Sequence, residues 1–441
     1  MFELTGQAST CCNGVTRRDF VRIGTLGLGG LTLSSLLKHR AESASSGESP
    51  PKTAVIFVEL DGGPSQIETY DPKPESPLEY RGAFSPVQTN VPGVAFSETM
   101  IEQSRVMDKM AVIRSLSHTS ADHGNSGHLI CTGYYRGTGQ GGPQEKPGVG
   151  AVASRVRGPN TPAMPSYVAL LGQMRYAKGL YLGHAHDPFT VDDSPNKKDF
   201  RVKNLALGPN LDFDRLNDRR NLLAELDTQR RLADIAATAK AIDTYTYKAF
   251  EMITNGRAAE AFNIHAEPER IRDRYGRNHL GQAMLLARRL VEAGVMFVSV
   301  REREWDDHSS IELRSRKLRP RYDKAMAALI ADLYQRGLDK HVLLVALGEF
   351  GRTPKINKGA GRDHWPQVMS AVLSGGGLRV GQVVGSSTSR AEEPREKPYR
   401  PDNVLAMVYR HLGIDPSTTF PDYNGRPQYL LEHRGIIGEL I

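Results

Sequence analysis

The chain has 441 residues, enough to bury a sizeable core in one to three domains, which excludes a mini-protein held together by disulfides. Hydrophobic residues make up 39% of the chain and charged residues 24%, with 43 glycines and 26 prolines. This composition is typical of a loop-rich globular protein and excludes a coiled coil or a disordered chain. The net charge is +7, from 57 basic and 50 acidic residues without a dense basic run, so we expect no nucleic-acid partner.

The first 44 residues are interpreted as an export signal. Arg17 and Arg18 precede an uncharged, glycine-rich stretch at residues 23–37. A twin arginine before a moderately apolar segment is typical of a twin-arginine (Tat) signal peptide, and this stretch is too short for a good membrane span. We therefore expect cleavage near Ala44, a linker at residues 45–52, and contact with the Tat translocase during export. An ordinary basic start or a membrane anchor is the alternative.

The mature protein is expected to be periplasmic or otherwise extracytoplasmic, without a stable membrane span. Of the three cysteines, Cys11 and Cys12 fall in the predicted signal and Cys131 remains. A single thiol excludes an intramolecular disulfide in the mature chain.

Short apolar strands alternate with amphipathic helices from residue 53 onward. Strands are predicted at 53–60, 110–114, 295–300, 341–347, 368–373 and 380–384, and helices at 149–156, 280–293 and 322–335. A polar, helix-prone stretch at about 211–275 interrupts this order as a helical insertion. The alternation predicts a single α/β domain over residues 53–441, with a mostly parallel sheet sandwiched by helices.

Acidic and histidine side chains follow four of the predicted strands. Asp61 ends the first strand, a histidine-dense stretch at 117–128 follows the second, and Asp306 to His308 and Glu349 follow two later ones. Because ligands bind at the carboxyl ends of parallel strands, we expect these groups to converge at one edge. Each signal alone is more often a turn, a helix cap or a surface residue, so the conjunction carries the prediction.

Carboxylates and imidazoles together form a site suited to a divalent ion such as Zn, Mn, Mg or Ca, with Fe also compatible. Arg352 follows Glu349 closely, and its planar guanidinium suits a phosphate or sulfate oxyanion, with an ordinary ion pair as the alternative. The candidate metal ligands are Asp61, His128, Asp306, Asp307, His308, Glu349, Asp363 and His364.

Several of these segments resemble the bacterial family called domain of unknown function 1501. The resemblance covers nearly all of residues 50–441 and rests on DGGPSQ at 61–66, WDDH at 305–308, GEFGRTP at 348–354 and DHW at 363–365, with the stretches 114–133 and 285–294. That family looks like a remote branch of the alkaline phosphatase and sulfatase superfamily, which implies an alkaline phosphatase-like fold. Twin-arginine signals are common in the family.

The resemblance also implies roles for individual residues. Asp61 resembles the first metal aspartate of the superfamily. Asp306 and His308 look like the Asp/His pair delivered by a later strand, and His364 looks like the last metal histidine. The superfamily commonly has adjacent Asp-His at the position of Glu349 and the phenylalanine that follows it. One ligand of a second metal is therefore missing here or supplied elsewhere.

The histidine-dense stretch at 117–128 contains candidates for the missing metal ligand and for the nucleophile. His123 and His128 are candidates for the missing ligand or for acid/base partners. Cys131 lacks the Cys-x-Pro-x-Arg context of a formylglycine sulfatase, so Ser126 is the nucleophile candidate, with Thr119 behind it. Alternatively, Asn125 and Ser126 cap a helix.

The sequence therefore predicts an exported, metal-dependent hydrolase of phosphate or sulfate esters, with Ser126, His123 and Arg352 in catalytic roles. The alternative is a catalytically degenerate domain that binds an anionic polysaccharide or another extracytoplasmic ligand, which the Glu349 departure favours.

Overall fold

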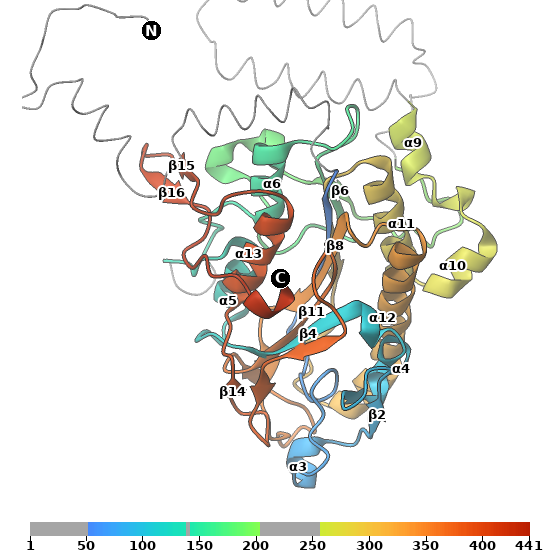
Figure 1. Ribbon diagram of the computed structural model, residues 1–441, viewed down its shortest axis with the longest axis vertical. Coiled ribbons are helices and arrows are strands. Elements are labelled where there is room, and N and C mark those ends of the chain that lie inside the picture. Colours follow the sequence, from blue (N-terminus) through green and yellow to red (C-terminus); the bar gives the residue numbers. More distant parts are fainter. Residues whose placement is uncertain (1–51, 138–141, 203–255) are drawn as a thin grey trace, which may run out of the picture. The chain divides into compact units, whose positions relative to one another are not determined.

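A single eight-stranded sheet organises the computed structural model, which describes residues 52–137, 142–202 and 256–441 (Figure 1). The strand order is β12-β4-β11-β8-β1-β7-β5-β6, and β11 is antiparallel to both of its neighbours while the other neighbouring pairs are parallel. The predicted mostly parallel α/β sheet is confirmed. The strands are β1 (Ala54–Leu60), β4 (Met110–Leu116), β5 (Tyr167–Leu170), β6 (Phe189–Val191), β7 (Phe297–Glu302), β8 (Val342–Gly348), β11 (Met369–Gly375) and β12 (Gln382–Val384).

Strand β1 lies near the centre of the sheet and is buried on both faces. Its Val58 pairs with Val300 of β7 on one side and Ala346 of β8 on the other. Successive side chains alternate between the faces, so Ile56 packs in one hydrophobic cluster and Phe57 in the other. An unbroken apolar run is what a strand covered on both faces requires.

Helices cover both faces (Figure 1). One face packs against α9 (Arg257–Phe262), α10 (Glu269–Tyr275), α11 (His279–Ala293) and α12 (Ile311–Gln335), and the other against α5 (His123–Thr132), α6 (Val149–Arg157) and α13 (Pro401–His411). Helix α11 ends at Gly294, whose φ of 107° suits glycine.

Smaller elements surround the sheet. They comprise α3 (Leu78–Arg81), α4 (Ile101–Ser104) and the strand pairs β2 (Pro86–Gln88) with β3 (Ala95–Ser97), β9 (Gly351–Arg352) with β10 (His364–Trp365), β13 (Ser386–Ser387) with β14 (Pro394–Glu396), and β15 (Thr419–Pro421) with β16 (Pro427–Tyr429). Within the described ranges, no helix combines the length and apolar character needed to cross a bilayer.

The predicted helix at 322–335 begins earlier than its pattern indicates. Helix α12 starts at Ile311 and continues through Pro320, a residue that usually interrupts a helix. Helices α9 and α10 lie within the predicted insertion. The rest of that insertion, from 211 to 255, and the predicted signal peptide and linker up to residue 51 lie outside the described residues.

Candidate metal centre

Several of the predicted site residues lie at the carboxyl edge of the sheet. Asp61 follows β1, Asp306 follows β7 and Glu349 follows β8, and these three strands are parallel neighbours. His123 is the first residue of α5, the helix that follows β4. His364 belongs to β10 and pairs with Arg352 of β9. The topology therefore brings segments far apart in sequence to one place.

Asp306, His308 and His364 form the centre of the cluster. The Oδ1 atom of Asp306 lies 3.0 Å from Nε2 of His308 and 3.2 Å from Nε2 of His364. The two Nε2 atoms are themselves 2.9 Å apart. Three ligand-type atoms from three side chains thus point at one another.

The hydrogen bonds of the two Nδ1 atoms indicate which nitrogen of His308 and of His364 carries the proton. His364 Nδ1 is 2.7 Å from the carbonyl oxygen of Ala121, which only accepts hydrogen bonds, so this nitrogen is assigned the proton. His308 Nδ1 is 2.7 Å from Oδ1 of Asp363 and donates to it. Each neutral ring then keeps its lone pair on Nε2. Two lone pairs and a carboxylate oxygen in mutual contact repel one another, and a divalent cation between them removes that repulsion.

His123 lies beside this centre with a carboxylate at each ring nitrogen. Its Nδ1 is 2.7 Å from Oε1 of Glu349, and its Nε2 is 3.3 Å from Oδ2 of Asp306. Burial alone would lower the pKa of His123, but the hydrogen bonds to both carboxylates raise it to about 9. Ligand atoms of His123, Asp306 and His364 all lie within 4.8 Å of one another. His123 therefore holds a proton within reach of the centre.

Glycine at position 62 lets the end of β1 approach the Asp306 loop. The Gly62 amide donates to both carboxylate oxygens of Glu349, at 2.9 and 3.1 Å. Its φ is +116°, and an added Cβ would lie 2.5 Å from the backbone nitrogen of Asp306. A side chain at this position would therefore clash with backbone atoms, which cannot move aside as the end of a flexible side chain can.

Gly62→Ala is expected to lower the free energy of unfolding by about 2 to 3 kcal/mol, because it adds a backbone clash to an unfavourable φ. The matched control is Gly93→Ala, where φ is +79° and nothing lies within 4 Å of the added Cβ. The control should cost about 1 kcal/mol. Urea unfolding measures both, and equal losses would contradict the close approach at Gly62.

Arg352 is fully buried next to Asp306. Its Nε donates to the Gly63 carbonyl at 2.8 Å, and its Nη1 donates to the Arg362 carbonyl at 3.1 Å. Its Nη2 lies 2.6 Å from Oδ1 of Asp306. Burial would raise the pKa of Asp306, but the hydrogen bond from His123 and the contact with the Arg352 guanidinium hold it well below its usual range. Arg352 thus positions the central carboxylate and is enclosed by protein atoms, away from any external anion.

Asp61 lies beside the centre in a group of arginines. Its Oδ1 is 2.9 Å from Nη2 of Arg175, and its Oδ2 is 2.6 Å from Nη2 of Arg301. Burial alone would raise the pKa of Asp61, but the two guanidinium groups lower it. The sequence patterns did not single out these arginines. They bind both oxygens of the Asp61 carboxylate, the group that the resemblance assigns to a metal.

The structure places Asp307 and His128 in other networks. Asp307 is buried and accepts from Arg314 Nε at 2.6 Å, with Arg319 as a second partner. His128 donates from Nδ1 to the Tyr134 carbonyl at 2.7 Å, and its Nε2 accepts from the Glu145 amide at 3.1 Å. Neither side chain shares the Asp306 cluster.

Ser126 is buried in α5 and its hydroxyl donates to the carbonyl oxygen of Ser120 at 2.7 Å. The helix cap is Asp122, whose side chain accepts from the amide of Asn125 at 2.8 Å. The expected cap thus exists, but one turn earlier than Asn125 and Ser126.

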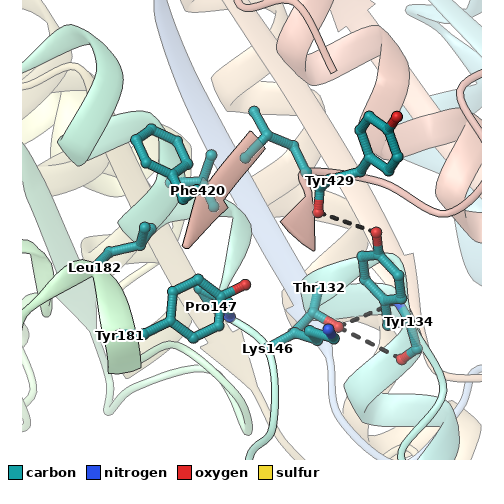
Figure 2. Close-up of a pocket in the computed structure, with 10 residues that line it drawn as sticks. Thr132, Tyr134, Lys146, Pro147, Tyr181, Leu182, Phe420 and Tyr429 are labelled. Atoms are coloured by element: carbon teal, nitrogen blue, oxygen red, sulfur yellow. Dashed lines mark hydrogen bonds between the residues drawn. The ribbon is translucent and has the colours of Figure 1, made fainter. Parts of the chain in front are cut away.

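A small pocket lies away from this centre, beside the β15–β16 hairpin (Figure 2). Aromatic side chains line much of it, including Tyr134, Tyr181 and Tyr429. The Tyr134 hydroxyl donates to the Tyr429 carbonyl at 3.0 Å, and the Lys146 ammonium lies 5.0 Å from the Tyr134 ring centre. None of the residues lining it belongs to the Asp306 cluster.

A family profile described as "Protein of unknown function (DUF1501)" matches residues 52–441, in agreement with the sequence motifs. Among curated proteins none matches the chain.

Solved structures similar to this chain include the PsFucS1 sulfatase from Pseudoalteromonas sp., at 12% identity and a TM-score of 0.36, covering 86% of this chain and 70% of the sulfatase. They also include the alkaline phosphatase of the Antarctic bacterium TAB5, at 12% identity and a TM-score of 0.34, covering 83% of this chain and 99% of the phosphatase. The lipoteichoic acid synthase LtaP from Listeria monocytogenes is similar at 8% identity and a TM-score of 0.34, over 85% of this chain and 78% of the synthase.

Proposed function

This chain belongs to the family described as proteins of unknown function (DUF1501), and we propose that it is an exported, metal-dependent hydrolase of phosphate or sulfate esters. The observation that carries the proposal is the contact among Asp306 Oδ1 and the Nε2 atoms of His308 and His364, at 2.9 to 3.2 Å. Export rests on the twin arginine at Arg17 and Arg18, which lies outside the described residues.

The donor set fits a divalent ion with a preference for nitrogen and oxygen ligands, such as Zn, Mn, Mg or Ca. Asp306, His308 and His364 would hold it, with Asp363 and the Ala121 carbonyl fixing the orientation of the two rings. A bound ion supplies a Lewis acid that polarises an ester oxygen and lowers the pKa of water.

His123 suits the role of general acid. Glu349 binds its Nδ1 proton, so the second proton sits on Nε2, the nitrogen that faces Asp306. From there it can be donated to the leaving oxygen of an ester. The Ser126 hydroxyl, by contrast, is buried and already donates to the Ser120 carbonyl. This environment favours water as the attacking group over Ser126.

The test begins with the full chain purified without a chelating tag. Elemental analysis is expected to find about one divalent ion per chain, and Asp306→Asn should lose most of it. A panel of aryl phosphate and aryl sulfate esters should be hydrolysed by the metal-loaded wild type and not by Asp306→Asn. Ser126→Ala should retain activity.

The matched control is Glu102→Gln, which changes a carboxylate in an exposed ion pair with Arg105 and should affect neither readout. A wild-type protein that binds no divalent ion, or equal hydrolysis by Asp306→Asn, would contradict the proposal.

A second candidate function is a catalytically degenerate domain that binds an anionic polysaccharide. It is favoured by Asp61, whose carboxylate contacts Arg175 and Arg301 in place of a metal. In that case the same protein should leave every ester of the panel intact, whether or not it takes up metal.

A further inference from the structure

Arg175 presents open hydrogen-bond donors at the edge of the metal centre. Its Nη2 donates to Asp61 Oδ1 at 2.9 Å, while its Nε and Nη1 have no hydrogen-bond partner in the described part of the chain. The side chain is 34% exposed. Its backbone amide donates to the buried carboxylate of Glu59 at 3.1 Å, which fixes the base of the residue.

The two other arginines at this edge are differently placed. Arg301 is 17% exposed and donates from Nε and Nη2 to Asp61 and from Nη1 to the Gln173 carbonyl. Arg352 is fully buried, and each of its side-chain nitrogens donates to protein oxygens. Of these three guanidinium groups, Arg175 therefore offers the free donors.

Packing against α5 brings Arg175 close to His123. A Cβ added at Gly127 would lie 2.9 Å from Cδ of Arg175, so the arginine stem crosses the helix at this glycine. Gly127 follows His123 by four positions, and residues so spaced share a helix face, with Cβ positions about 5 to 6 Å apart. The guanidinium and the proposed general acid therefore border the same space.

We propose that Arg175 binds the anionic group of the substrate, a phosphate or sulfate oxyanion, next to the metal centre. A guanidinium donates charge-assisted hydrogen bonds to such oxyanions, here from Nε and Nη1, and the tether of Nη2 to Asp61 limits the side-chain freedom lost on binding. This assignment rests on the proposed function. It gives Arg175 the anion-binding role that the sequence predicted for Arg352.

The test measures the binding of inorganic phosphate and of inorganic sulfate to the zinc-loaded full chain by calorimetry. Arg175→Met is expected to weaken binding of the preferred anion roughly 10- to 100-fold, as for the loss of a charged hydrogen-bond donor. Arg175→Lys keeps the charge but not the fixed planar donors, so an intermediate loss is expected. Arg105→Met, which breaks an exposed pair with Glu102, is the matched control and should bind as the wild type does.

Zinc content and thermal unfolding of each variant are measured first. Equal anion affinities in wild type and Arg175→Met, at equal zinc content, would overturn the role of Arg175 while leaving the metal centre intact. A wild type that binds neither anion would overturn it as well. Failure of the wild type to bind zinc or any other divalent ion would instead overturn the proposed function. The same anion titration of the metal-free chain would then still test the role of Arg175.

Discussion

Glu68→Ala is expected to lower the free energy of unfolding by about 3 to 5 kcal/mol, because it leaves the buried Arg362 without its counter-ion. The Arg362 side chain is fully buried, and its Nε lies 3.0 and 2.9 Å from the two carboxylate oxygens of Glu68. Its Nη2 lies 2.7 Å from Oε1 of the same group. A guanidinium that stays charged in a dry environment is costly once this partner is gone.

The same pair supports the metal centre. Arg362 directly precedes Asp363 and His364 and also donates to the carbonyls of Thr353 and Tyr80, at 3.0 and 2.7 Å. We therefore expect Glu68→Ala to weaken metal binding as well, although Glu68 contacts no proposed ligand.

Urea unfolding of the metal-free chain measures the stability change. Glu102→Ala is the control, since its partner Arg105 is 66% exposed and the loss should stay within about 1 kcal/mol. Similar small losses of unfolding free energy in both variants would show that groups other than Glu68 stabilise the buried charge of Arg362.

The sheet was predictable where each strand is a long apolar run. Strands β1 and β8 are buried along their whole length, and such runs leave a clear pattern. Strands β5 and β6 were not predicted, because segments of four and three residues carry too little periodicity. The early start of α12 was hidden by Pro320, because proline usually interrupts a helix whereas α12 continues through it.

The convergence of the site was predictable from strand ends, but the direction of each side chain was not. Asp306 and Asp307 are neighbours, yet one faces His308 and the other faces Arg314 and Arg319. His128 lies five residues after His123 on α5, which rotates it by about 140° from the His123 face. Such choices depend on partners distant in sequence.

Arg175 illustrates the same limit. It lies in a loop after β5 with no motif around it, and its position follows from contacts with Asp61 and Gly127. A hydrogen-bond donor can be recognised as unpaired only when the positions of all neighbouring acceptors are known.

His123 is expected to make the stability of the metal-free protein fall as pH rises. Its pKa is raised from 6.5 to about 9 in the folded state by the hydrogen bonds to Asp306 and Glu349, which outweigh burial. A group with a raised folded-state pKa stabilises the protein fully below pH 6.5, and this contribution is lost as pH rises through 9. At about 1.4 kcal/mol per pKa unit, the loss amounts to at most about 3 kcal/mol.

The measurement is urea unfolding at several pH values between 6 and 9.5 in the presence of a chelator, because a bound metal would change the charges around His123. The stability difference between wild type and His123→Gln should shrink over this window. His128→Gln is the control, because burial lowers the pKa of His128 in the folded state, so its stability difference from the wild type should not shrink as pH rises. A constant difference for His123→Gln would mean that its Nε2 carries no extra proton at neutral pH, and the general-acid role would then have to pass to another group at this edge of the sheet.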